Sequence, residues 1–278
     1  MNQSRRKMNI VLLLFVVAFG SFLSLTVIPS TEAAGPCVAG PHNGVINSDQ
    51  SWCAANSPHL VTGTVTVANG VTLTIEPGVE VRMSGANTSI IVNGTVDAQG
   101  TSADGILFTT NNFTFEPGQW KQLIFNASST ANVFDYATIE YGGYFDPAVD
   151  IRTDDFTMRN SIIRNNALIG MELNNASPTI RTTNFTNNVG RALELNGASF
   201  PTLDELNASG NDFDGVSING TTITEDYIWG QGIDNYLVTD SVTVNPDTTL
   251  DIVPGTTVRF LGTNYYGRWH LDRRGHCR

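Results

Sequence analysis

Apolar residues alternate with polar or small residues along most of the chain. In GTVTVANGVTLTIEPGVEV (63–81) the alternation is interrupted by ANG and EPG, and the apolar positions are Val65, Val67, Val71, Leu73, Ile75, Val79 and Val81. A period of two is typical of strands that bury one face, and Gly, Pro and Asn end such strands in turns. No segment after residue 34 keeps the spacing of an amphipathic helix, so the sequence predicts an all-β fold.

A second, longer repeat has the length of one turn, or coil, of a stacked solenoid. Asn166, Asn188 and Asn211 recur at a nearly constant spacing, and each is followed seven residues later by an apolar residue. The same spacing separates Met158, Ile180 and Leu203. A repeat this short cannot bury its apolar face alone, so coils must stack on one another. We predict a solenoid with coils of about 22–24 residues, in which the three asparagines form a ladder of side-chain hydrogen bonds.

A third period relates two longer segments. LVTGTVTVANGVTLTIEPGVEVRMSG, which begins at Leu60, aligns without a gap with LVTDSVTVNPDTTLDIVPGTTVRFLG, which begins at Leu237, and the two agree at 14 of 26 positions. We therefore predict an N-terminal cap (35–57), one solenoid unit (58–222) and the start of a second, homologous unit (223–263).

Several segments between Leu60 and Ile218 resemble the coils of a known family. VTLTIEPGVEVRM, IIVNGTVDAQGT, ILFTT, PGQWKQLIF and FDYATIEYGG are similar, in that order, to the coils of the right-handed parallel β-helix family. Pectate lyases and many secreted surface proteins share this architecture. The resemblance implies a right-handed parallel β-helix solenoid, and its motifs are specific for the fold rather than for an activity.

The N-terminus has the pattern of an export signal. Arg5, Arg6 and Lys7 precede an apolar run (10–28), and small residues follow it up to Ala34. We predict that residues 1–34 are a signal peptide and that the protein is secreted or displayed on the cell surface, without membrane contact after cleavage. A retained anchor is the alternative, because the apolar run is long enough to span a bilayer.

The C-terminal residues differ in composition from the rest. The last eleven positions hold four arginines, two histidines and one cysteine, whereas residues 35–264 contain 24 acidic and 8 basic residues. Codons for this tail can be chosen so that reading them one base later gives ITVDGTLTAEGT, which agrees with IIVNGTVDAQGT from Ile90 at seven of twelve positions. We hypothesise that residues 264–278 are frameshifted and that the chain is a fragment of a longer array. A genuine basic tail is the alternative.

The net charge argues against one class of partner. The net charge is -11, and the only lysines are Lys7 and Lys121, so no basic stripe favours nucleic acid.

Cys37 and Cys53 are expected to form a disulfide, which persists in exported proteins. A metal site formed by these cysteines with His42 and His59 is the alternative, although their spacing is not that of a closed site.

Candidate catalytic residues are few. Asp154 and Asp155 resemble the acid and base of polysaccharide hydrolases on this fold, but adjacent strand residues point to opposite faces. The Gly-His-Gly and Arg-x-Lys motifs of those hydrolases are absent, so we interpret the pair as an exposed turn.

Arg159 and Arg181 are separated by one coil length, as are Glu172 and Glu194, which predicts ion pairs between coils. The sequence thus argues against an enzyme, with a polysaccharide lyase or glycoside hydrolase as the alternative.

Two candidate binding sites remain. Asp212 and Asp214 in GNDFDG resemble part of a calcium loop without its downstream glutamate, so a turn is the preferred interpretation. We expect no cofactor, and calcium is left open as the alternative. Two aperiodic segments (111–120 and 141–149) carry Trp120, Tyr141, Tyr144 and Phe145. Such residues more often cover a gap in the core, and an aromatic platform for sugar rings is the alternative. We therefore expect a structural or adhesive protein whose partners are extracellular polysaccharides or cell-envelope components.

Overall fold

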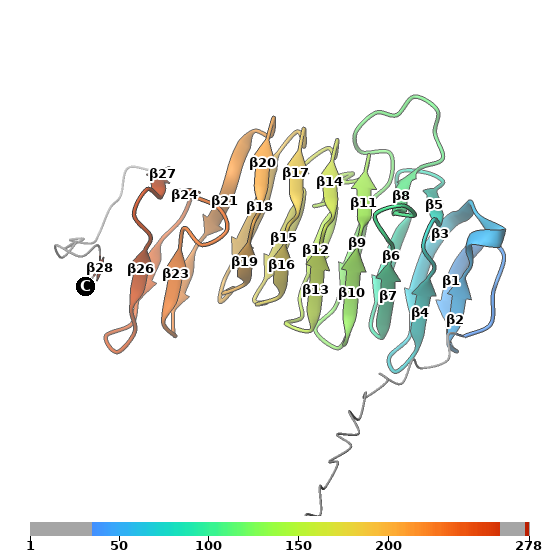
Figure 1. Cartoon of the computed structure of the whole chain (residues 1–278), viewed down its shortest axis with the longest axis horizontal. Helices are drawn as coiled ribbons and strands as arrows, with labels where there is room; N and C mark the ends of the chain where they lie inside the picture. Colours follow the sequence, from blue (N-terminus) through green and yellow to red (C-terminus); the bar gives the residue numbers. More distant parts are fainter. Residues whose placement is uncertain (1–34, 262–275, 278) are drawn as a thin grey trace, which may run out of the picture. The chain divides into compact units, whose positions relative to one another are not determined.

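The computed structural model describes residues 35–261 and the backbone of 276–277. The predicted signal peptide (1–34) and most of the predicted frameshifted tail lie outside the described residues. The described part is all-β apart from one short 3-10 helix, η1 (Ala54–Asn56). Parallel strands stack in about ten coils spaced about 23 residues apart, which confirms the predicted solenoid (Figure 1). No helix among the described residues is long and apolar enough to cross a membrane.

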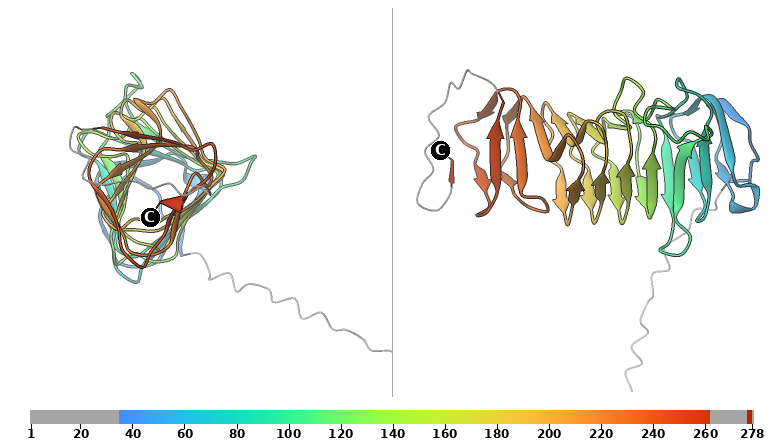
Figure 2. Two further views of the ribbon diagram at one scale, coloured as in Figure 1. Left: turned by 90° about the vertical axis from the view of Figure 1, so that its left-hand side faces the viewer. Right: turned by 90° about the horizontal axis from the view of Figure 1, so that it is seen from above.

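Each coil of the first unit contributes one strand to each of three faces, so the view along the stack is a closed ring (Figure 2). The first face contains β6 (Ser89–Val92), β9 (Gln122–Phe125), β12 (Val149–Ile151), β15 (Met171–Asn174), β18 (Arg191–Asn196) and β21 (Phe213–Asn219). The second face contains β5 (Glu80–Met83), β8 (Ile106–Thr110), β11 (Ala137–Glu140), β14 (Ile162–Arg164), β17 (Asn184–Thr186) and β20 (Asn207–Ser209). The third face contains β2 (Gln50–Trp52), β4 (Thr72–Ile75), β7 (Thr95–Gln99), β10 (Asn132–Asp135), β13 (Phe156–Arg159), β16 (Thr179–Arg181) and β19 (Thr202–Asp204).

One long strand joins the first and second faces. The first half of β3 (His59–Val67) pairs with β5 and its second half pairs with β6, while β1 (His42–Ile46) lies on its other edge. Beyond β21, the sheet continues through β24 (Asn235–Val238) and β27 (Thr257–Phe260). Two small sheets accompany this extension: β22 (Thr221–Ile223) with β25 (Val242–Val244), and β23 (Tyr227–Trp229) with β26 (Leu250–Ile252) and β28 (His276–Cys277).

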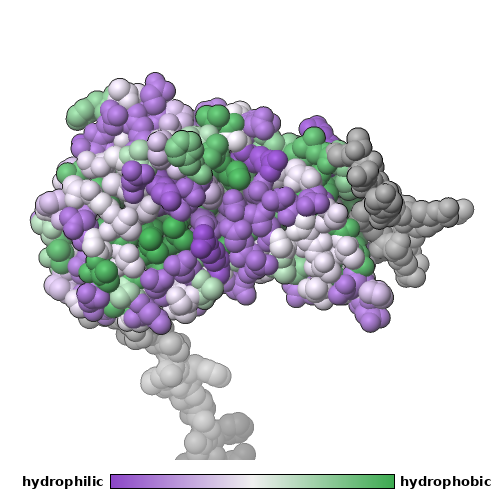
Figure 3. All heavy atoms as spheres, turned by 180° about the vertical axis from the view of Figure 1, so that it is seen from behind, coloured by the Kyte–Doolittle hydropathy of each residue, from purple (hydrophilic) through white to green (hydrophobic). Residues whose placement is uncertain are grey.

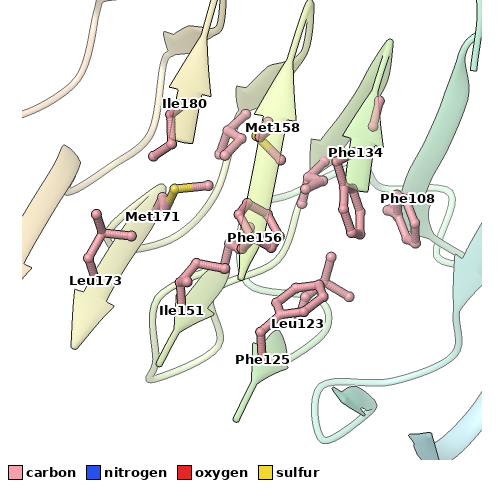
Figure 4. Close-up of a cluster of buried hydrophobic side chains, with 14 of the residues drawn as sticks. Phe108, Leu123, Phe125, Phe134, Ile151, Phe156, Met158, Met171, Leu173 and Ile180 are labelled. Carbon is pink, nitrogen blue, oxygen red and sulfur yellow. The ribbon is translucent and has the colours of Figure 1, made fainter. Parts of the chain in front are cut away.

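The core runs through the interior of the stack as rows of equivalent residues. Phe134 of β10, Met158 of β13 and Ile180 of β16 pair in consecutive registers, and all are buried. The rings of Phe125 and Phe156 lie 4.9 Å apart and fill the space between the first and third faces (Figure 4). Alternation therefore buries the inward residue of each strand, and stacking makes one continuous core.

Candidate functional site at one corner of the solenoid

The corner between the second and first faces carries the longest connections between neighbouring coils. Residues 111–121 join β8 to β9, and residues 141–148 join β11 to β12. Figure 1 shows the first of these loops projecting beyond the neighbouring strands. In later coils the same corner is closed by short turns that contain Asn166, Asn188 and Asn211. Loops that leave a regular solenoid on one side are the usual place for binding residues.

The predicted asparagine ladder holds this corner together. Asn166 Nδ2 donates to Asn188 Oδ1 at 2.9 Å, and Asn188 Nδ2 donates to Asn211 Oδ1 at 2.8 Å. The backbone N–H of Gly142 donates to Asn166 Oδ1 at 2.8 Å, which ties the loop 141–148 to the first rung. Asn166 and Asn188 are both buried, so these hydrogen bonds satisfy amides that water does not reach.

The ladder ends at Asp214. Its carboxylate accepts hydrogen bonds from the backbone N–H groups of Gly210 and Asn211, at 3.1 and 2.8 Å, and from the Asn211 side chain at 2.8 Å. These contacts close the turn and support its interpretation as a turn. Asp212 lies in the same turn and is exposed.

Two loops at this corner expose aromatic side chains. Phe113 and Phe145 are each 80% exposed, and Phe115 is 50% exposed. The ring centroids of Phe115 and Tyr141 are 5.7 Å apart, and those of Tyr144 and Phe145 are 4.3 Å apart. We call these five residues the exposed aromatic surface. The candidate platform residues included three of them, and Phe113 and Phe115 were missed because an exposed and a buried aromatic residue look alike in an aperiodic segment.

Part of this surface has an unusual backbone. Phe115, Tyr141 and Phe145 have φ angles of 51°, 61° and 63°, in the left-handed region that bulky side chains rarely adopt. Such conformations persist only where the surrounding structure imposes them, and they concentrate at binding and active sites. The loops therefore hold these aromatic side chains outward at a cost in backbone energy.

Trp120 does not belong to the exposed aromatic surface. It covers the core, which is the preferred interpretation of these residues from the sequence. Its side chain is 0% exposed, and Nε1 donates to the carbonyl oxygen of Glu140 at 2.8 Å. A Cβ on Gly142 would lie 2.8 Å from its ring, so the loop backbone packs directly on the indole. Trp120 fills the core below the loop and supports the residues above it.

A row of carboxylates lies next to this corner on the outer side of the first face. Asp150, Glu172 and Glu194 are in register on β12, β15 and β18. Arg152 pairs with Asp150 at 2.5 Å, and Arg191 pairs with Glu194. Glu172 instead accepts hydrogen bonds from Asn174 and Asn196, both at 2.8 Å.

Glu172 has a perturbed acidity. Burial raises the pKa of its carboxyl group, the asparagine hydrogen bonds oppose that shift, and the charges of Asp150 and Glu194 add to it. A carboxyl group held between two others is a feature of acid and base sites and also of structural networks. The sequence did not single out this row as a site, because its members recur once per coil and each looks like an ordinary outward strand position.

Arg159 forms the predicted ion pair between coils, but its partner is neither Glu172 nor Glu194. Arg159 pairs with Asp135 at 2.8 Å and is in register with Arg181 on the third face. The two glutamates lie on the first face. The shared sequence step shows that residues stack, but it does not show on which face of the coil they stack.

Asp154 and Asp155 lie in the turn between β12 and β13, and both are exposed. Asp154 Oδ1 accepts a hydrogen bond from the backbone N–H of Ser177 in the next coil, at 2.6 Å. The Asp155 backbone N–H donates to Thr153 Oγ1 at 3.2 Å. The pair thus occupies the exposed turn that was the preferred interpretation, and Asp154 links two coils.

The N-terminal coil contains the predicted disulfide. Cys37 and Cys53 are bonded, with Cα atoms 5.6 Å apart, so their sulfurs are not free to bind a metal as thiolates. His42 Nε2 lies 2.9 Å from His59 Nδ1, and His59 Nε2 lies 3.0 Å from the carbonyl oxygen of Cys53. Burial, and then the neighbouring His59, lower the pKa of His42 to about 4. The two histidines therefore belong to a packed cap, which removes the alternative of a cysteine and histidine metal site.

Apolar residues on the rest of the surface are scattered. On the side shown in Figure 3, they form separate small patches among polar residues. Isolated exposed apolar residues are normal on protein surfaces, whereas groups of them mark interaction sites. The exposed aromatic surface is therefore the feature of the described residues that most favours a binding role.

Comparison with known proteins agrees with the architecture. Residues 44–147 match the sequence model of a family described as pectate-lyase like beta helix domain. Together with the parallel coils, this match confirms the predicted relation to the parallel β-helix family. No curated protein and no solved structure matches the chain. Because one fold carries many functions, the function is argued from the residues at the corner.

Proposed function

We propose that this parallel β-helix protein is exported and serves as a structural or adhesive module that binds extracellular carbohydrate or cell-envelope glycans. The observation that carries the proposal is the exposed aromatic surface, in which Phe113 and Phe145 are each 80% exposed at one corner of the stack. Flat aromatic rings pack on the apolar faces of sugar rings and lose little conformational entropy when they do so.

The coils beneath support this role. The asparagine ladder and the indole of Trp120 fix the two loops, so the aromatic rings are held before a ligand arrives. Preorganisation lowers the entropic cost of binding. A stack of parallel coils also places such a surface on a long, regular support, which suits a spacer or adhesin.

The test is binding of the purified chain to a glycan array, compared with the double variant Phe113→Ala and Phe145→Ala. Val45 and Val253 are 58% and 36% exposed away from this corner, and their double alanine variant is the matched control. We expect the aromatic variant to lose about tenfold or more in affinity, because truncated aromatic contacts typically cost about 1–2 kcal/mol at interfaces. Equal binding by both variants would remove the aromatic surface from the proposal.

A second candidate function rests on the carboxylate row. Asn174 Nδ2 donates to both Asp150 Oδ1 and Glu172 Oε1, at 2.9 and 2.8 Å, so one amide group bridges two carboxylates. A glycoside hydrolase uses two carboxyl groups with different pKa values, and the pKa of Glu172 is raised. Screening polysaccharides for release of reducing or unsaturated ends, with Glu172→Gln as the variant, tests this alternative. Turnover that Glu172→Gln abolishes would favour the enzyme over the adhesin.

A further inference from the structure

A groove lies at the same corner, between the turn after β5 and the loop that carries Phe113. Its volume is about 520 Å³, within the range of about 300–1,000 Å³ that is usual for ligand sites. The lining residues are Ser84, Gly85, Ala86, Asn111, Asn112, Phe113, Gly118 and Gln119. A Cβ on Gly118 would lie 3.9 Å from Tyr144, so the groove borders the exposed aromatic surface.

The lining combines one aromatic ring with carboxamides. Phe113 is 80% exposed and forms an apolar wall. Among the described residues, the Asn111 carboxamide has no hydrogen-bond partner, and Asn112 uses only Oδ1, which accepts from the Thr114 N–H at 3.2 Å. A carboxamide both donates and accepts, which matches the hydroxyl groups of a sugar.

Gln119 has a different role in this groove. Its Oε1 accepts from Thr110 Oγ1 at 3.0 Å, and its Nε2 donates to Thr114 Oγ1. These hydrogen bonds hold the base of the loop closed. Gln119 therefore shapes the groove, while Asn111 and Asn112 offer groups to a ligand.

The charges in and around the groove indicate whether it suits a neutral or an anionic sugar. None of the lining residues is charged. The nearest cations along the chain on either side are Arg82 and Lys121, and they pair with Glu80 at 2.9 Å and with Asp146 at 3.4 Å. The chain carries a net charge of -11, so its overall field repels polyanions. A uronic acid chain would bring carboxylates to a site that has no unpaired cation among its lining residues to receive them.

We infer that this groove is a binding site for a neutral glycan, with Phe113 packing on a sugar ring and Asn111 and Asn112 hydrogen-bonding its hydroxyl groups. The inference rests on the proposed carbohydrate-binding function and names its ligand class. It also excludes the anionic polyuronates as the preferred ligands of this site.

The experiment measures binding of the whole chain by isothermal titration calorimetry. The probes are cellohexaose, xylohexaose and mannohexaose as neutral ligands, and hexagalacturonate as the anionic one. We expect a neutral hexaose to bind more tightly than hexagalacturonate. Phe113→Ala and Asn111→Ala are each expected to weaken that binding about tenfold, as is typical when a ring contact or a hydrogen bond is removed from a binding site.

The matched control is Asn184→Ala, since Asn184 is exposed on β17, away from the groove. It should bind as the unmodified chain does, and circular dichroism should show all variants folded. Tighter binding of hexagalacturonate would overturn the inference and leave carbohydrate binding intact. Neutral binding unaffected by Phe113→Ala and Asn111→Ala would overturn the assignment to this groove. Absence of binding to every probe and to the glycan array would refute the proposed function itself.

Discussion

Trp229 and Tyr236 stack with their ring centroids 5.3 Å apart and their planes 14° apart. In the sequence repeat they are the equivalents of Trp52 and His59, which stack at 5.5 Å and 10°. The Tyr236 hydroxyl accepts from the backbone N–H of Gly230 at 3.2 Å, and His59 contacts the backbone of Cys53, the equivalent residue, at 3.0 Å. The sequence repeat is therefore also a repeat of packing, with the disulfide confined to the first copy.

The same repeat makes a prediction with an internal control. Asp49 Oδ1 accepts from the Thr72 N–H at 2.8 Å, and Asp226 Oδ1 accepts from the Thr249 N–H at 2.8 Å. Asp49→Ala and Asp226→Ala should each lower the free energy of unfolding by about 1 kcal/mol, because each leaves one backbone N–H without this partner. Urea denaturation measures the loss, and Glu225→Ala is the neutral control. Losses that differ several-fold would show that the two contacts are not equivalent.

The asparagine ladder predicts a large effect at its middle rung. Asn188→Ala removes hydrogen bonds to both Asn166 and Asn211 in a buried turn. We expect the free energy of unfolding to fall by about 2–3 kcal/mol, because the remaining amides are buried without partners. Asn184→Ala, at an exposed position on the preceding strand β17, should change it by less than about 0.5 kcal/mol. A loss at Asn188 no larger than that at Asn184 would argue against the ladder.

The disulfide predicts a loss of stability at the N-terminal end. Cys37 and Cys53 are 16 residues apart, and removing a crosslink across a loop of this size costs about 3 kcal/mol. The double variant Cys37→Ser and Cys53→Ser should show that loss in denaturant. Hydrogen exchange should locate the faster opening in β1 to β3, with β15 to β18 unaffected. Uniform acceleration along the whole stack would contradict a local cap.

His42 predicts a loss of stability in mild acid. Its folded pKa of about 4 lies below the ordinary value of 6.5, so the unfolded chain binds a proton in this range that the folded chain does not. The contribution of His42 to stability is therefore fully present above pH 6.5, and it decreases as pH falls from 6.5 to about 4. Melting temperatures measured across this range should fall less steeply for His42→Gln than for the unmodified chain. Parallel curves would exclude His42 as the cause.

For Glu172 we predict the opposite pH dependence of stability. Its pKa is raised in the folded state, so its charge costs stability at neutral pH, and this cost disappears as pH falls below the ordinary pKa of 4.5. Glu172→Gln should raise the free energy of unfolding at pH 7 by about 0.5–1 kcal/mol, because it removes a partly buried charge and, with it, repulsion from Asp150 and Glu194. The gain should vanish near pH 4. Glu80→Gln, which breaks the pair with Arg82, is the control and should give no gain.

Periodic features were predictable from the sequence, and isolated ones were less so. The ladder at Asn166, Asn188 and Asn211 follows from a spacing that any stacked coil must keep. For Trp120 the sequence left a core role and a platform role open, because a loop residue next to a strand can point inward or outward and the local pattern does not decide which. Phe113 was missed because nothing in an aperiodic segment distinguishes an exposed aromatic residue from a buried one.

The sequence by itself determined that this chain forms short strands, stacks them in coils of one length and repeats from Leu237 the pattern that begins at Leu60. Alternation and fixed spacing specify these features locally, because each coil buries its apolar face only against a copy of itself. The tertiary structure alone decided which outward residues share a face and a corner. Arg159 and Glu172 follow the same step but lie on different faces, whereas the loops that carry Phe113 and Phe145 belong to different coils and lie at the same corner. Small differences in turn geometry set these directions, and the spacing of residues does not record them.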